Sequence, residues 1–82
     1  MARLVTTTLF DILRRNLDSI NQSTVDGLRV RLERDDPRLE RRRILDPKSG
    51  KEFWLVGEER VFLTYSDEGT FLLLTACFRR RD

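Results

Sequence analysis

The chain has 82 residues and a mass of 9.8 kDa, which allows a single domain. Hydrophobic residues make up 39% and charged residues 37%, which excludes a disordered chain, and no apolar run exceeds four residues, which excludes a membrane-spanning helix. Histidine is absent and Cys77 is the single cysteine, so His-based catalysis, an internal disulfide and a Cys/His zinc site are excluded. We expect no cofactor and no metal. Because the N-terminus has no signal-peptide pattern, we expect a cytoplasmic protein.

The net charge of +2 is unevenly distributed along the sequence. Residues 1–40 carry seven basic and seven acidic residues, whereas residues 41–82 carry nine basic and seven acidic ones. Within the second half, residues 41–51 hold five basic residues and one acid, and residues 79–81 are all arginine. These two clusters fit solvated surface segments, which is the commoner case. They would converge into one basic site if the apolar stretch between them folds back on itself.

The first forty residues contain a short strand and one or two helices. Residues 3–8 are rich in β-branched side chains, which favours a strand. Residues 9–20 show an apolar stripe at helical spacing, with Thr8 as the predicted N-cap. Residues 23–34 fit two structures, because their leucines and valines satisfy both helical spacing and strict alternation with charged residues. Gly27 disfavours the helix by about 1 kcal/mol relative to Ala.

The second half predicts an antiparallel meander. Residues 38–51 are expected to be mostly loop, anchored by Ile44 and Leu45. Residues 52–56, 60–65 and 70–78 are rich in aromatic and branched side chains and are separated by short polar turns, so we predict three antiparallel strands. The last strand is apolar on both faces and is predicted to lie inside the sheet. The residues alone therefore predict the α+β class: a short N-terminal strand, one or two helices and a three-stranded meander.

Several sequence strings resemble the RelE/ParE toxin superfamily. The opening LVTTTLFDILRRNL is similar to the strand and helix that begin these toxins, and DDPRLERRR is similar to the end of their second helix. KEFWLVGEERVFLTY and TFLLLTACFRRR resemble the central strand pair and the last strand. The motifs are loose but span nearly the whole chain. The resemblance implies one RelE-like toxin domain over residues 1–82, with residues 23–34 helical and thus a two-helix hairpin between the first strand and the meander.

The favoured RelE branch implies the toxin of a type II toxin–antitoxin system that cuts messenger RNA on the ribosome. A ribose 2′-hydroxyl attacks the adjacent phosphate without a metal, and cations stabilise the charged phosphorane. The resemblance implies catalytic roles for Arg60, Arg80 and Lys51, and its implied partners are a cognate antitoxin, the ribosome and messenger RNA. The residues implied to bind RNA are Arg79, Arg81, Arg43 and Lys48.

Each of these assignments has a plainer alternative. Arg60 follows two glutamates and fits a surface ion pair at a hairpin, Lys51 fits a turn lysine, and the last arginines fit a solvated chain end. RelE-type relatives continue past the last strand into a short helix that carries a tyrosine or another base, and no such segment follows Phe78 here. The only tyrosine, Tyr65, is predicted to pack in the core. The missing base keeps two alternatives open: a ParE-like inhibitor of DNA gyrase and a non-enzymatic basic binding module.

Two further side chains are predicted to serve packing. Trp54 lies in an apolar strand and is expected in the core, in preference to stacking on a base. Cys77 also lies in an apolar strand, and we expect a buried, unreactive thiol.

Overall fold

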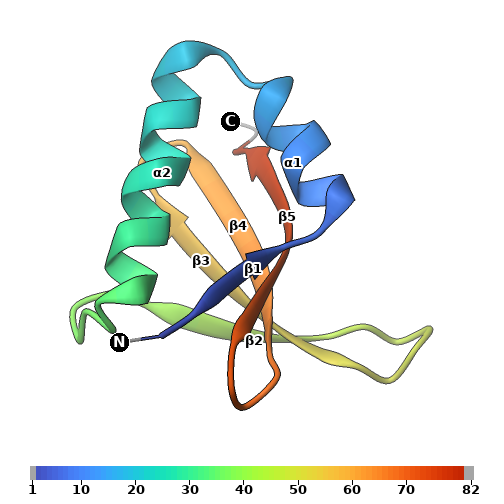
Figure 1. Cartoon of the computed structure of the whole chain (residues 1–82). Helices are drawn as coiled ribbons and strands as arrows, with labels where there is room; N and C mark the ends of the chain where they lie inside the picture. The colour runs from blue at the N-terminus through green and yellow to red at the C-terminus, as the bar shows by residue number, and fades with distance from the viewer. Residues whose placement is uncertain (1, 81–82) are drawn as a thin grey trace.

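The computed structural model describes residues 2–80, which form two helices and five strands. Arg81, one of the predicted RNA-binding residues, lies outside the described residues. No helix in residues 2–80 is long and apolar enough to cross a membrane. The predicted α+β class is confirmed (Figure 1). The elements in chain order are β1 (Leu4–Thr6), α1 (Thr8–Arg15), α2 (Ser19–Glu33), β2 (Arg41–Leu45), β3 (Glu52–Glu58), β4 (Val61–Asp67) and β5 (Leu72–Arg79).

The first helix is shorter than the sequence predicts. It begins one residue earlier than expected, because the hydroxyl of Thr7, not Thr8, caps it by accepting the N–H of Phe10 at 3.1 Å. It ends at Arg15, and a new helix begins after Asp18, whose carboxylate accepts the N–H of Asn21 at 2.8 Å. The predicted continuous helix over residues 9–20 is therefore two helices, because a second N-cap interrupts it.

Residues 23–34 are helical except for the C-cap at their end. Val25, Leu28 and Leu32 are fully buried within α2, as helical spacing requires. Val30, which a half-buried strand would place beside Leu28 and Leu32, is 43% exposed. The tertiary contacts of one helical face thus outweigh the helix-weakening effect of Gly27.

The five strands form one mixed sheet in the order β1-β5-β4-β3-β2. Strands β2 to β5 are an antiparallel meander, and β1 pairs in parallel with β5. The meander has four strands instead of three, because Arg41–Leu45 pairs with β3 where the sequence predicts a loop. Ile44 and Leu45 do not anchor that segment, since they are 36% and 61% exposed. The prediction that the last strand is internal is confirmed, since β5 lies between β1 and β4.

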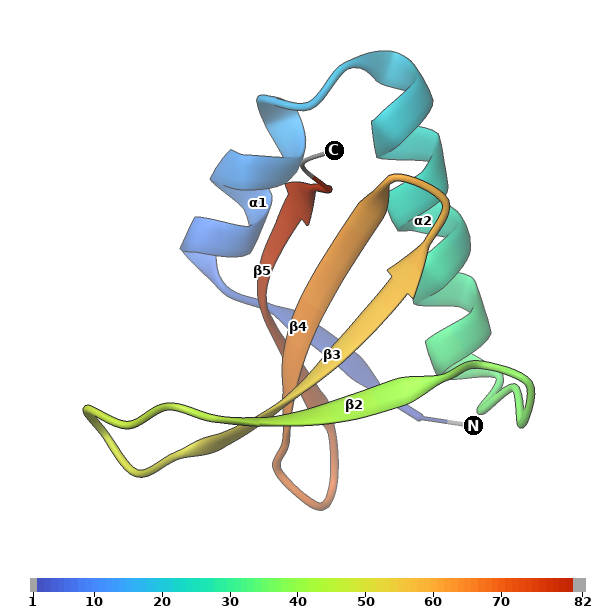
Figure 2. The same cartoon turned by 180° about the vertical axis from the view of Figure 1, so that it is seen from behind.

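The helices cover one face of the sheet and leave the other open. Helix α1 packs on β5 and helix α2 packs on β3 and β4. Viewed from behind in Figure 2, the sheet has no helix in front of it, and β2 crosses the lower part. Tyr65 and Cys77 lie in the core as predicted, and Trp54 packs against it. The core consists of Phe10, Val25, Leu28, Leu32, Leu39, Val56, Val61, Leu63, Tyr65, Leu74 and Cys77.

Candidate functional site

Three arginines meet at one end of the sheet. The β3–β4 turn carries Arg60, and strand β5 ends beside this turn because Val61 pairs with Arg79. The backbone N–H of Arg80 donates to the carbonyl oxygen of Arg60 at 2.6 Å, which fixes the two segments together. We call Arg60, Arg79 and Arg80 the arginine cluster. Its members are close in space although they come from separate parts of the chain.

The strand register directs Arg79 and Arg80 to opposite faces of the sheet. Successive strand residues alternate between faces, and Phe62 pairs with Phe78 while Val61 pairs with Arg79. Arg79 therefore shares the helix-covered face with the buried Val61. Arg80 shares the open face with Phe62, and its Cζ atom lies 5.5 Å from the centroid of that ring. Arg80 is thus the C-terminal arginine of the described chain that is aimed at the open face.

The arginine cluster lines a hollow between the end of the sheet and the loop that joins the two helices. We call this the end hollow. The side chain of Asp18 within it is already engaged by Asn21, through the backbone N–H and the side-chain Nδ2 at 3.2 Å. The residues that line the end hollow are Asp18, Ile20, Asn21, Glu59, Arg60, Arg79 and Arg80.

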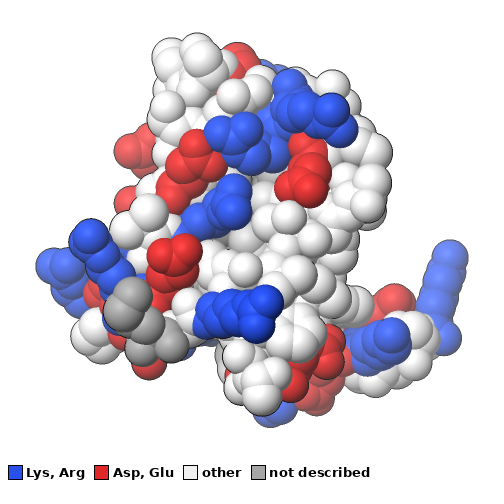
Figure 3. All heavy atoms as spheres, viewed as in Figure 1, with Lys and Arg blue, Asp and Glu red and all other residues white. Residues whose placement is uncertain are grey.

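The cluster differs from most other arginines in having no carboxylate partner within residues 2–80. Arg14 pairs with Asp26 at 2.7 Å, and Arg31 pairs with Glu58 at 3.0 Å. Such pairs interleave blue and red side chains across the helical face in Figure 3. A guanidinium group that is not paired with a carboxylate of the protein keeps its N–H donors available for an external anion. The cluster is therefore chemically suited to hold phosphate.

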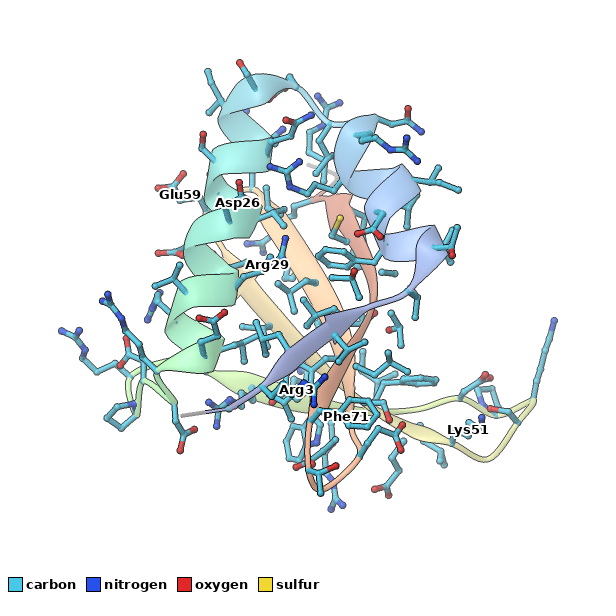
Figure 4. The ribbon with its side chains drawn as sticks, viewed as in Figure 1. Arg3, Asp26, Arg29, Lys51, Glu59 and Phe71 are labelled. Carbon is cyan, nitrogen blue, oxygen red and sulfur yellow. The ribbon has the colours of Figure 1, made fainter. Side chains whose placement is uncertain are left out.

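The structure does not bring Lys51 to the cluster. Lys51 lies in the β2–β3 hairpin just before β3 begins (Figure 4), and Arg60 follows the opposite end of β3. A strand of seven residues separates them, which is roughly 20 Å at about 3.3 Å per residue. Lys48 lies in the same hairpin loop, where its backbone N–H donates to Asp46 at 3.0 Å and lowers the pKa of that carboxyl.

Arg43, also predicted to bind RNA, is engaged elsewhere. Its Nη2 donates to Glu52 at 2.7 Å, and its Cζ lies 5.4 Å from the Trp54 ring centroid on the helix-covered side. Both contacts hold the side chain away from the cluster. Of the predicted site residues in the described chain, the structure gathers Arg60, Arg79 and Arg80 and separates Lys51, Lys48 and Arg43 from them.

A second hollow lies on the open face, and Arg42, which the sequence-based assignment omitted, lines it. We call this the open-face hollow. Arg42 pairs in register with Leu55, and Arg80 comes from the end of β5, so the two basic clusters of the sequence converge here in part. The lining residues are Glu40, Arg41, Arg42, Leu55, Gly57, Glu58, Glu59, Phe62 and Arg80.

The groups that could exchange a proton near the cluster are carboxylates. Tyr65 is only 3% exposed on the helix-covered face, and burial raises the pKa of its phenol. Glu59 lines both hollows and has a positive φ of 54°, which is uncommon for a residue with a side chain. The sequence signal that could have indicated it is the GEER string, where a glutamate precedes Arg60 in a two-residue turn.

No protein family, curated protein or solved structure matches this chain. Within residues 2–80, no group of three cysteine or acidic side chains is placed to hold a metal ion. The two hollows are therefore the features of the described chain from which a function can be inferred. Together their linings offer carboxylates, an aromatic ring and four arginines that have no carboxylate partner within residues 2–80: Arg42, Arg60, Arg79 and Arg80.

Proposed function

We propose that this chain is a RelE-like toxin of a type II toxin–antitoxin system, and that it cuts messenger RNA on the ribosome. The observation that carries the proposal is the arginine cluster, which joins two segments about twenty residues apart into one cationic site without a carboxylate partner in the described chain. The resemblance of the sequence strings to the RelE/ParE superfamily supports the same function.

In the proposed reaction, a ribose 2′-hydroxyl attacks the adjacent phosphate. Arg60 and Arg80 each donate to phosphorane oxygens as negative charge develops. Glu59 lines the same hollow and is the carboxylate available to accept the hydroxyl proton. As the 2′-oxygen bonds to phosphorus, the bond from phosphorus to the 5′-oxygen breaks, which leaves a 2′,3′-cyclic phosphate, and the departing 5′-oxygen takes a proton from water. Lys51 is assigned no part in this step, because the length of β3 separates it from the cluster.

The proposed partner is a cognate antitoxin that covers the arginine cluster. Charge complementarity requires an acidic surface opposite Arg60, Arg79 and Arg80. Such a cover would exclude RNA phosphate from the same guanidinium groups, so inhibition and substrate binding would compete directly.

Induced expression in bacteria tests the proposal, with growth and messenger RNA 5′ ends read together. We expect the wild-type chain to arrest growth and to produce cuts inside translated codons. Arg60→Ala and Arg80→Ala should each lower cleavage by roughly 10²-fold or more, because each removes one donor to the transition state. Arg3→Ala is the matched control, since Arg3 is exposed and has no carboxylate partner in the described chain but lies at the opposite end of the molecule (Figure 4).

A ParE-like inhibitor of DNA gyrase is the second candidate. It is favoured by the absence of a lysine or an accessible tyrosine from the residues that line the two hollows. Growth arrest with broken DNA and intact messenger RNA would support this candidate and contradict the endoribonuclease. If a folded wild-type chain causes no arrest, both toxin proposals are wrong and a non-enzymatic binding module is left.

A further inference from the structure

The open face carries a pair of stacked phenylalanines, and one of their rings lies over a glycine of the neighbouring strand. Phe62 and Phe78 are register partners on β4 and β5, and their ring centroids are 5.6 Å apart with an interplanar angle of 30°. Gly57 is the partner of Phe62 on β3. A Cβ atom at Gly57 would lie 2.6 Å from Cε1 of Phe62, so the ring occupies the place where any other residue would have its side chain. The ring thus lies against the backbone of β3.

One ring of this aromatic pair, Phe78, is exposed to solvent, and the other, Phe62, is half-buried. Phe78 is 42% exposed, and no helix covers this side of the sheet (Figure 2). Arg80 lies over the Phe62 ring, and Arg42 lines the same hollow from β2. Neither guanidinium has a carboxylate partner in the described chain. An aromatic pair with two such cations in the same hollow matches a nucleotide, which combines a planar base with phosphates.

The acidic residues of the hollow do not cancel these cations. The carboxylate of Glu58 is already paired with Arg31 at 3.0 Å on the helix-covered side. Glu40 and Glu59 are exposed residues among the lining of the hollow, and neither pairs with an arginine within residues 2–80. A purely apolar peptide segment would gain nothing from two unpaired arginines beside it, which favours a polyanion as the occupant.

We infer that the open face binds one unpaired RNA base by stacking it on the Phe62–Phe78 pair, while Arg42 and Arg80 contact the flanking phosphates. This inference rests on the proposed function and names how the substrate is held beside the arginine cluster, with Arg80 lining both hollows. Base–aromatic stacking is tolerant of sequence, because every base has a π face, so it would position RNA without selecting one base.

A binding experiment with two oligonucleotides tests the stacking. One is a hexanucleotide of 2′-O-methyl RNA, which lacks the attacking hydroxyl, with 2-aminopurine at its centre. The other has an abasic site in the same position. We expect the full chain to quench the 2-aminopurine fluorescence and to bind the abasic oligonucleotide about 10-fold more weakly. Phe62→Leu and Phe78→Leu should each reduce the affinity for the 2-aminopurine oligonucleotide to that for the abasic oligonucleotide. Phe71→Leu, at the far end of the sheet (Figure 4), should leave both affinities unchanged.

Gly57→Ala provides an independent test that keeps both aromatic residues. The added Cβ must displace the Phe62 ring, so we expect the same loss of base-dependent binding. Arg42→Ala and Arg80→Ala should weaken both oligonucleotides alike and reduce the salt dependence of binding. Circular dichroism establishes that each variant is folded.

The outcomes separate the two proposals. Equal affinity for the two oligonucleotides, or no binding of either by a folded protein, overturns the stacking inference. Unchanged base-dependent binding by Phe62→Leu and Phe78→Leu also overturns it. The proposed function is decided separately, by the growth and messenger RNA experiment with Arg60→Ala.

Discussion

Arg14 and Asp26 join the two helices through a two-point contact. Nε of Arg14 donates to Oδ1 of Asp26 at 2.9 Å, and Nη2 donates to Oδ2 at 2.7 Å. This pair lowers the pKa of the Asp26 carboxyl and raises that of the Arg14 guanidinium, in both cases chiefly through the side-chain hydrogen bonds. The arginines of the described chain therefore divide into those that bind its own carboxylates and those, such as Arg60 and Arg80, that have no such partner.

The Asp26 contact predicts a pH-dependent effect of Asp26→Asn on stability. A carboxyl whose pKa is lower in the folded state stabilises the fold fully above its unfolded pKa of about 3.9, and this contribution is lost as pH falls through the folded pKa. At pH 7 we expect Asp26→Asn to lower the free energy of unfolding by about 1 kcal/mol, since the pair is partly exposed. Urea unfolding at pH 7 and below pH 3 should show the difference shrinking. An equal difference at both would contradict the assignment.

Cys77 predicts an unreactive thiol. Burial raises its pKa to about 11, and the side chain is 1% exposed, so both thiolate content and access are low at neutral pH. We expect alkylation by iodoacetamide at pH 8 to be slow in buffer and fast in 6–8 M urea (about the range that unfolds small domains). Rapid labelling of the folded protein would show that the β5 region opens readily.

At the scale of residues, the sequence predicted the site in part. Arg60 and Arg80 meet as expected, because strands joined by a short turn bring the start of one beside the end of the next. Lys51 was assigned to the same site as Arg60 because both lie next to a predicted strand. They lie at opposite ends of that strand, however, since β3 runs from Lys51 toward Arg60. Glu59 and Arg42 were missed because their relation to Arg80 depends on the lateral order of strands.

At the scale of elements, strand β2 was not predicted from the sequence, and its side chains show why. Its five residues, three of them arginines, are all exposed, so the segment has no buried face to produce an alternating pattern. It is a strand because its backbone pairs with β3 at the edge of the sheet. Charged side chains on an edge strand also discourage pairing with another molecule. The break between α1 and α2 was also not predicted, because the apolar stripe continues through it. The break depends on the side chain of Asp18, which caps the second helix.

The β3–β4 pair predicts a coupled effect of Gly57 and Phe62. Gly57→Ala should lower the free energy of unfolding by about 1–3 kcal/mol, because its Cβ would overlap the Phe62 ring. In a Phe62→Ala background the same substitution should cost little, since the overlapping atoms are gone. A double-mutant cycle by urea unfolding measures this coupling. Additive effects would mean that the ring lies elsewhere.

At the scale of the whole molecule, Thr7 connects the two ends of the described chain. Its backbone N–H donates to the carbonyl of Leu74 at 3.0 Å, and its hydroxyl donates to the carbonyl of Thr75 at 3.1 Å while also capping α1. Thr7 thus lies between the end of β1, which pairs in parallel with β5, and the start of helix α1. The sequence predicted β1 as a strand, but the partner of a three-residue strand is distant in sequence and leaves no local pattern.

Thr7→Ala should therefore destabilise the whole fold. We expect the free energy of unfolding to fall by about 1–2 kcal/mol, because one hydroxyl serves both the cap and the link to β5. Thr7→Ser keeps the hydroxyl and is the matched control. Thermal unfolding of the three proteins checks this, and equal midpoints for Thr7→Ala and the wild type would contradict it.

The position of β5 between β1 and β4 also has a consequence in time. A nascent chain is made from its N-terminus, so β1 waits without a partner until residues 72–79 have left the ribosome. The same residues bring Arg79 and Arg80 to Arg60. Under the proposed function, an unfinished chain would have neither the complete five-stranded sheet nor a phosphate-binding site. It could not cut the messenger RNA on the ribosome that is still translating it.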